Sequence, residues 1–251
     1  PPKLTRIEND TFCNCTKLHG SLFIHNSITY IGSGAFYNCS SLNGILDISN
    51  SVEYIGDECF KECKNLFGSL IIPNSVKIIG HGAFYNCRGF NGKLSISNSL
   101  SEIESEVFRY CSGFHGNLEI PNFILSIGEY AFSGCNGFDG SLILSTNLKY
   151  IKDFAFSNCY NLSGKLNFPH NVALIESYAF YDCKGFSGSL KLPSLIKTVN
   201  SYAFFGCNGL NGSLTIHDSV TRINDHAFDS CSGFTGSLII PDSVTKIGNW
   251  A

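Results

Sequence analysis

Hydrophobic positions return every 24 residues along this chain. Each copy begins with Leu-x-Ile or a close variant, as at Leu70–Ile72, where two inward side chains flank an outward one. An aliphatic pair three residues apart follows, Val76 and Ile79, and then an Ala-Phe-x-x-Cys block that ends at Cys87. Alternation over so few residues predicts two short strands in each copy. Strands of successive copies are expected to stack in parallel, about 4.8 Å apart.

The period is unbroken. Ten cysteines are spaced 24 residues apart, each with Phe three residues before it and Gly five residues after it. They are Cys15, Cys39, Cys63, Cys87, Cys111, Cys135, Cys159, Cys183, Cys207 and Cys231. Strict self-similarity at such a period indicates a solenoid. We therefore predict one solenoid over residues 1–251, with a partial coil over 1–20, nine full coils over 21–236 and a partial coil over 237–251.

The block from residue 32 to residue 39 predicts a short helical turn. Its first polar position, Ser33, is mostly Ser or Asp in the other copies, and these residues cap helix N-termini. Phe36 and Cys39 then face inward, and packing must hold so short a helix. The predicted fold class is a β-rich α/β solenoid with stacked parallel β-sheets and short helical turns. The glycine that closes each coil, Gly20 and its equivalents, is expected to need a positive φ or a close backbone approach.

Twelve cysteines raise the alternative of a disulfide framework. Adjacent coils would bring the periodic cysteines to a Cα separation that a disulfide allows, but their Cβ vectors point in parallel towards the core. Free cysteine packs as a small hydrophobe, so we predict reduced, buried thiols. Cys59 replaces an inward alanine and is expected in the core. Cys13 lies at an outward position, where an exposed thiol, a reactive thiol and a local bridge to Cys15 all stay open. The predicted core ladder includes Phe36, Cys39, Phe84, Cys87, Phe132, Cys135, Phe180 and Cys183.

Composition excludes several function classes. Charged residues make up 15% of the chain, and a net charge of −3 with a pI near 6.2 gives no basic field for nucleic acid or anionic membrane. No apolar run of about 18 residues is present, and no signal peptide is visible. The sequence contains no HExxH motif, CxxC pair or nucleophile elbow, and His25 and His217 share a coil position eight coils apart. We expect no cofactor, no metal site and no enzymatic activity.

The two ends indicate part of a longer protein. The sequence begins Pro1-Pro2, contains no methionine and ends one residue before the Phe that the period requires. Any secretion signal or membrane anchor is therefore expected outside these 251 residues.

The repeat pattern L-x-I-P-x-S-V-x-x-I-G-x-x-A-F-x-x-C-x-x-[LF] resembles the BspA-like, or Treponema-type, class of leucine-rich repeats. The resemblance covers essentially the whole chain, and the AFxxC element makes it specific. Each coil is one residue longer than the usual member, near Gly20 and its equivalents. The Gly-Phe-x-Gly-Ser-Leu spelling there looks most like copies in trichomonad-like protist surface proteins. The resemblance implies a curved right-handed solenoid on cell-surface or secreted proteins that act as adhesins or recognition molecules.

Two columns of outward residues are candidate binding surfaces. The strand column, the outward residue of each first strand, varies freely while its inward neighbours hardly change, which fits either a displayed surface or simple drift. Its members are Phe23, Asp47, Ile71, Ser95, Glu119, Ile143, Asn167, Lys191, Thr215 and Ile239. The aromatic column lies on the helical-turn face and fits either an interface hot spot or a cluster that covers the turn. Its members are Tyr130, Phe154, Tyr178 and Tyr202, with Trp250 at the same coil position.

Five N-x-S/T sequons fit either secretion or chance in a chain rich in Asn and Ser. They lie at Asn9, Asn14, Asn38, Asn161 and Asn211. With the resemblance, they favour a non-enzymatic cell-surface or secreted module for recognition or adhesion, whose partner is a protein or glycan of a host or neighbouring cell. The alternatives are an intracellular, cytoplasmic protein-interaction scaffold and a structural spacer without a ligand. Fold alone does not decide among the three.

Overall fold

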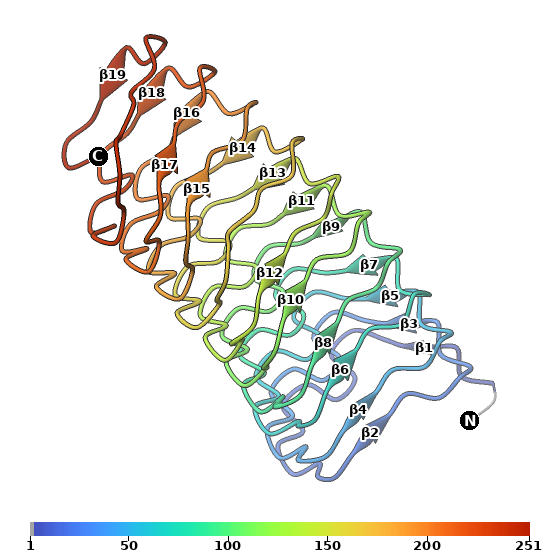
Figure 1. Ribbon diagram of the computed structural model, residues 1–251. Coiled ribbons are helices and arrows are strands. Elements are labelled where there is room, and N and C mark those ends of the chain that lie inside the picture. The colour runs from blue at the N-terminus through green and yellow to red at the C-terminus, as the bar shows by residue number, and fades with distance from the viewer. Residues whose placement is uncertain (1–2) are drawn as a thin grey trace.

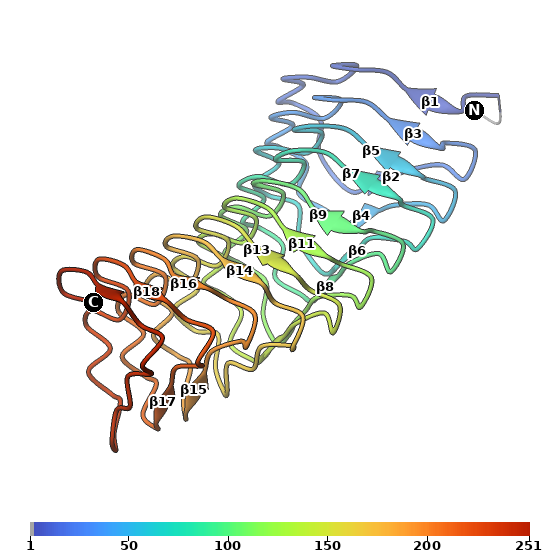
Figure 2. The ribbon, with the colours of Figure 1, turned by 90° about the horizontal axis from the view of Figure 1, so that it is seen from above.

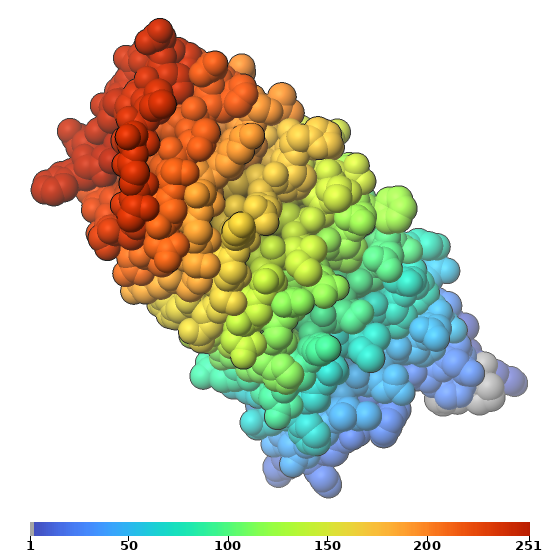
Figure 3. All heavy atoms as spheres, viewed as in Figure 1, coloured from blue at the N-terminus to red at the C-terminus, as the bar shows by residue number. Residues whose placement is uncertain are grey.

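The computed structural model describes residues 3–251 as one stack of coils, with the N- and C-terminal ends at opposite ends of an elongated body (Figures 1 and 3). Pro1 and Pro2, on which the expectation of a longer chain partly rests, lie outside the described residues. Every strand is two residues long and pairs in parallel with a strand 24 residues away, as when Leu22 pairs with Leu46. The solenoid of stacked parallel strands predicted from the period is therefore confirmed.

The strands lie on two faces of the stack (Figures 1 and 2). The first-strand face contains β2 (Leu22–Phe23), β4 (Leu46–Asp47), β6 (Leu70–Ile71), β8 (Leu94–Ser95), β10 (Leu118–Glu119), β12 (Leu142–Ile143), β15 (Leu190–Lys191) and β17 (Leu214–Thr215). The second-strand face contains β1 (Arg6–Ile7), β3 (Tyr30–Ile31), β5 (Tyr54–Ile55), β7 (Ile78–Ile79), β9 (Glu102–Ile103), β11 (Ser126–Ile127), β13 (Tyr150–Ile151), β14 (Leu174–Ile175), β16 (Thr198–Val199), β18 (Arg222–Ile223) and β19 (Lys246–Ile247). Pairing along the second-strand face is interrupted after β7 and after β14.

One core runs the length of the stack. All eight residues of the predicted core ladder are buried, and Cys59 is buried with them. Phe rings of successive coils stack on one another from Phe12 to Phe228, with centroids 5.2–5.7 Å apart. Because each ring lies between two others, the aromatic ladder joins the coils as well as filling them.

The predicted helical turns are absent, and residues 3–251 contain no helix. Residues 32–39 form consecutive turns instead, with Gly34 and Asn38 at φ of 63° and 53°. Alternate amides of this block donate along the stack to the next coil. The bonds run from Gly34 N to Asp57 O, from Phe36 N to Cys59 O and from Asn38 N to Lys61 O, at 2.7–2.8 Å. These amides point out of their own coil, so they cannot form the i→i−4 bonds of a helix.

The same three bonds recur at every junction from the first coil to the bond between Gly206 N and Asp229 O. We call this series the turn ladder. It needs left-handed backbone at two positions in each coil, which accounts for Gly, Asn and Asp at many of them. The turn ladder thus connects all successive coils, whereas the strand ladders on the two faces are interrupted.

Cysteine has a hydrogen-bonding role in the core. From Cys39 to Cys231, each periodic thiol donates to the carbonyl of the Phe 27 residues earlier, as when Cys135 Sγ donates to Phe108 O at 2.9 Å. All twelve cysteines are free. Burial raises the pKa of the Cys135 thiol well above its ordinary value, and raises that of Cys39 to about 11. Cys13 and Cys15, near the N-terminal end of the stack, are partly exposed.

Candidate binding surfaces

The structure places all ten residues of the strand column on the first-strand face with exposed side chains. Four of them are large apolar side chains that are nevertheless exposed: Phe23, Ile71, Ile143 and Ile239, with Ile71 63% and Ile239 75% exposed. No two of these four lie in adjacent coils, so polar side chains separate them. The column is therefore a mixed surface rather than one continuous apolar patch.

The coils of the first-strand face are joined in pairs. Backbone ladders connect β2 to β4, β6 to β8, β10 to β12 and β15 to β17, and none connects one pair to the next. Within the first pair, Leu22 N and Ile24 N donate to the next coil at 2.8 and 2.9 Å. Across the following junction, the amides of Leu46 and Ile48 have no hydrogen-bond partner among residues 3–251. We call these closed and open junctions respectively.

The residue before the closing glycine marks the closed junctions. Asn43 Oδ1 accepts the amide of Gly20 at 2.8 Å, and Asn91, Asp139 and Asn211 accept those of Gly68, Gly116 and Gly188 in the same way. The accepted glycines have φ between 80° and 87°. The next glycine in each pair has an ordinary φ but lies against the neighbouring backbone, where a Cβ on Gly44 would collide with Ser21. Both expected reasons for glycine therefore occur, in alternate coils.

The coil around Leu166 does not belong to any of these pairs on the first-strand face. Gly164 has a positive φ of 75°, but Ser187 stands where the paired coils carry Asn or Asp, and its side chain makes no bond to the Gly164 amide. Leu166 and its neighbours consequently form no strand. The junction to β15 thus lacks the side-chain acceptor that marks the closed junctions, whereas the junction after β12 is open like those after β4 and β8.

Three open junctions are hollowed into grooves. The groove after β4 has a volume of about 340 Å³ and includes Asp47, Asn50 and Pro73 in its walls. The groove after β8 has a volume of about 530 Å³, and that before β15 about 410 Å³. Their walls include Asn98 with Glu119, and His170 with Lys191, respectively. The strand column borders all three grooves.

The aromatic column is half-buried and stacked. Tyr130, Phe154, Tyr178 and Tyr202 lie with successive ring centroids 4.4–4.6 Å apart and nearly parallel. Their φ values of 55–59° place bulky side chains in the left-handed region, at a cost of roughly 1–2 kcal/mol each. The column continues through a residue that sequence reasoning missed, His226, on which Tyr202 stacks at 4.5 Å. Because each ring covers the face of the next, the column presents ring edges to solvent.

Cationic and exposed aromatic groups lie at the two ends of this column. The Arg109 guanidinium lies 4.1 Å from the centre of the Tyr130 ring, within cation–π distance. Trp250 follows His226 at the other end and is 76% exposed. Trp250 therefore offers more ring surface than any residue inside the column.

The sequon asparagines differ in the state of their amide nitrogens. Asn14 Nδ2 donates to Cys13 Sγ, Asn38 Nδ2 to Asn14 Oδ1 and Asn161 Nδ2 to Asn136 O. Asn9 and Asn211 are exposed and use only Oδ1, which accepts a backbone amide of a neighbouring coil. These two sites would lose no hydrogen bond on modification of the nitrogen.

Acidic residues gather on the side of the stack beside β9 to β14. Burial raises the pKa of Asp153 to about 6, and the neighbouring Glu176 carboxyl adds to the rise. Burial and Glu102 raise the pKa of Glu104 as well. Among residues 3–251, no group of three or more His, Cys, Asp or Glu side chains has a geometry that could hold a metal ion. In the same part of the chain, no helix could span a membrane.

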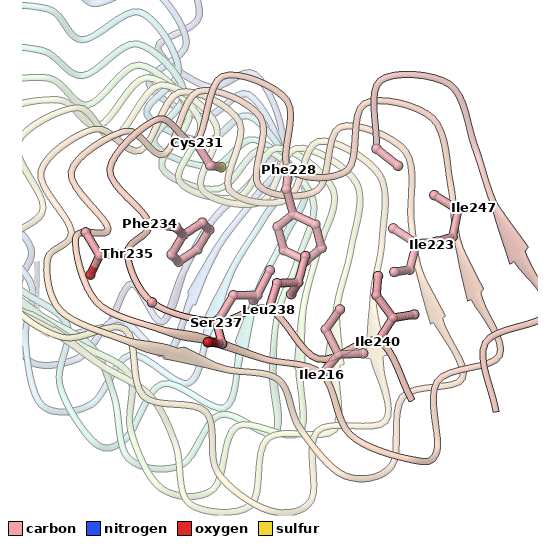
Figure 4. A pocket seen from close by; sticks show the side chains of 13 residues that line it. Ile216, Ile223, Phe228, Cys231, Phe234, Thr235, Ser237, Leu238, Ile240 and Ile247 are labelled. Carbon is pink, nitrogen blue, oxygen red and sulfur yellow. The ribbon is translucent and has the colours of Figure 1, made fainter. Parts of the chain in front are cut away.

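A further cavity, of about 300 Å³, opens at the C-terminal end of the stack (Figure 4). Phe228, Phe234 and Ile240 project into it from the last coils. Their counterparts in an inner coil, such as Phe132 and Phe138, are fully buried. This cavity is therefore the uncovered end of the core.

Comparison with known proteins agrees with this architecture. A family model for the BspA type leucine rich repeat region, of six copies, matches residues 1–115, 67–187 and 186–251. No curated protein shows a significant match to the sequence. The nearer likeness to protist copies stays a prediction.

Solved structures share the fold. A leucine-rich repeat protein from Bacteroides ovatus is 22% identical over 98% of this chain and 78% of that one, with a TM-score of 0.59. The leucine-rich repeat protein of T. pallidum is 26% identical over 63% of this chain and 72% of that one, with a TM-score of 0.53. The pneumococcal vaccine antigen PcpA is 20% identical over 98% of this chain and 66% of that one, with a TM-score of 0.55. Since the family model matches along the whole chain, this protein belongs to the BspA-type leucine-rich repeat family.

Proposed function

We propose that the chain is a non-enzymatic recognition module that binds an extracellular protein or glycan through its first-strand face. The exposure of all ten strand-column residues above a buried, repeated core carries the proposal. A rigid scaffold with a side chain of different chemistry in each coil suits selective binding. The similarly folded PcpA is a vaccine antigen, which supports a surface or secreted location.

The first-strand face suits a partner better than the aromatic column does. Rings inside the aromatic column already stack on their neighbours, so binding a partner there would use edges only. On the first-strand face, by contrast, exposed apolar side chains lie beside grooves that have unpaired backbone groups. The apolar side chains gain free energy when a partner covers them, and the unpaired backbone groups can offer hydrogen bonds to that partner.

Location and binding can be tested in sequence. Antibodies against the protein are applied to intact and to permeabilised source cells, and staining of intact cells is expected. The purified chain is then applied to candidate partner cells, with Ile71→Arg as the test variant. Ile78→Arg is the matched control, because Ile78 lies in the same coil and is 53% exposed but belongs to the second-strand face. We expect Ile71→Arg alone to reduce binding at least tenfold.

An intracellular scaffold is the second candidate, and the twelve free cysteines favour it, because reducing compartments keep thiols free. Staining that appears only after permeabilisation would place the protein inside the cell and favour the scaffold over the extracellular recognition module. If neither cells nor cell extracts bind the chain, a spacer without a ligand is the remaining function. Equal binding by the two Ile variants would refute the assignment of the face.

A further inference from the structure

We infer that the grooves at the open junctions bind sugar rings of a linear glycan that lies along the first-strand face. This inference rests on the proposed function and specifies its ligand class. Grooves at three junctions, unpaired backbone groups between their walls and a regular spacing all point to such a ligand.

At each open junction one backbone bond remains beside the closing glycine, such as that from Phe67 N to Gly44 O at 3.0 Å, but the strand amides and carbonyls beyond it face one another without bonding. After β4, the amides of Leu46 and Ile48 lie opposite the carbonyls of Ser69 and Ile71, and none of the four groups has a partner across the junction in the described chain. Cα atoms of β4 and β6 nevertheless lie within 8 Å of one another. An inserted peptide strand would need about 9.6 Å, twice the normal strand spacing. The junction is therefore too narrow for an inserted strand, so only smaller groups of a partner could reach these backbone atoms.

Hydroxyl groups suit this gap. A single hydroxyl both donates and accepts at one oxygen, so it can accept from an amide on one wall and donate to a carbonyl on the other. A peptide group separates its donor from its acceptor. Asp47 and Asn50 at the first groove, and Asn98 and Glu119 at the second, add amide and carboxylate partners for further hydroxyls.

The groove walls also match the apolar faces of a sugar ring. Pro73 and the exposed Ile71 line the first groove, and Pro121 and Ile143 line the second. Pyranose rings have C–H faces that pack on such side chains while the ring hydroxyls point to the rim. Volumes of about 340 and 530 Å³ lie within the usual range of small-molecule sites.

The spacing of the grooves favours a polymer. The first two grooves are two coils apart, roughly 10 Å at the parallel-strand spacing, which is about the length of a linear disaccharide unit. The third lies three coils beyond the second, because the segment around Leu166 forms no strand on the first-strand face. A chain that fills two grooves should bind more tightly than a disaccharide that fills one, through the high effective concentration of its second site.

Glycan-array binding tests the inference, with linear oligosaccharides of glucose, galactose, mannose and N-acetylglucosamine, two to eight units long. Asn50→Trp and Asn98→Trp place a bulky ring at the rim of the first and second grooves. Asn26→Trp is the matched control, since Asn26 has the same coil position but precedes a closed junction. All three side chains are exposed and make no hydrogen bond within residues 3–251, so thermal unfolding should be unchanged.

We expect at least one sugar series to bind, with affinity rising at least tenfold from dimer to hexamer. Each groove variant should reduce hexamer binding about tenfold, and Asn26→Trp should leave it unchanged. The inference is overturned if no oligosaccharide binds, or if both groove variants bind as the wild type does. If oligosaccharides fail but cells still bind in an Ile71-dependent and protease-sensitive way, the proposed function stands with a protein partner. If the chain binds neither, both proposals fail.

Discussion

Replacing Phe132 with Ala should remove about 4–5 kcal/mol of stability. The ring is fully buried and stacks between Phe108, at 5.3 Å, and Phe156, at 5.5 Å. Losing a buried aromatic side chain costs about 3–5 kcal/mol, and the cost is highest where neighbours cannot close the cavity. Here rings on both sides are held by their own coils, so we expect the upper part of this range.

Phe12→Ala is the matched control at the end of the same ladder. Phe12 is 37% exposed and stacks on only one ring, Phe36, at 5.2 Å. Part of its surface is already in water and solvent can fill the space it leaves, so we expect a loss of about 1–2 kcal/mol. The difference between the two variants isolates the effect of enclosure.

Urea unfolding provides the assay, with far-UV circular dichroism for the whole stack and fluorescence of Trp250 for its C-terminal end. Stability in a solenoid is a sum over coils and their interfaces, so a weak central coil can uncouple the two halves. We expect the midpoints of the two signals to separate in Phe132→Ala more than in the wild type. A loss below about 1 kcal/mol, or one no larger than that of Phe12→Ala, would refute the account of the core as a chain of enclosed rings.

Three further predictions follow from individual contacts. Iodoacetamide at pH 8 should label Cys13 and Cys15 in the native protein but spare Cys135, whose pKa burial raises. Peptide mass spectrometry reads this out, and labelling of the inner thiols without denaturant would contradict it. Asp153 has a folded pKa of about 6 against an ordinary 3.8, so its contribution to stability is complete below about pH 4 and is lost as the pH rises through 6. Asp153→Asn should therefore stabilise the protein by up to about 1 kcal/mol at pH 7, after allowance for solvent screening, and by almost nothing at pH 4; equal effects in urea unfolding at both pH values would count against this. Asn91→Ala should cost about 1 kcal/mol through the Gly68 amide, whereas Ser187→Ala, which breaks no such bond, should cost much less in the same assay.

Sequence pattern alone predicts the strands and the core well, because the same burial repeats in every coil. Leu70 and Ile72 are buried and Ile71 is exposed, as period-2 alternation requires. The turns could not be predicted in this way. Alternate amides of each turn bond to the next coil rather than within their own, and a short window of sequence does not contain that partner. Gly34 and Asn38, both tolerant of left-handed backbone, were the available signal against a helix.

The candidate surface could be predicted only in part. Alternation identifies the strand column, but it treats every junction as equal. Whether a junction is closed depends on a side chain such as Asn43 reaching the amide of Gly20 in the previous coil, 23 residues away. The signal is nevertheless in the sequence, because His19, Asn43, Phe67 and Asn91 alternate before the closing glycine. Reading it requires a period of two coils rather than one.

The turn ladder also makes one junction a hinge. Between the coil around Leu166 and the next, the first-strand face is open, and the second-strand face is interrupted between β14 and β16. Apart from an isolated bridge between Gly164 and Phe186, backbone bonding between the strands is missing on both faces there, and on the second-strand face a side-chain bond from Asn200 Nδ2 to Ile175 O at 2.8 Å crosses the junction. The turn ladder continues. Bending should therefore concentrate at this junction. The two parts of the stack would rotate relative to each other about the turn ladder, which stays bonded. Such flexing would widen the groove before β15 and would let the two rigid parts of the solenoid adjust to a curved partner.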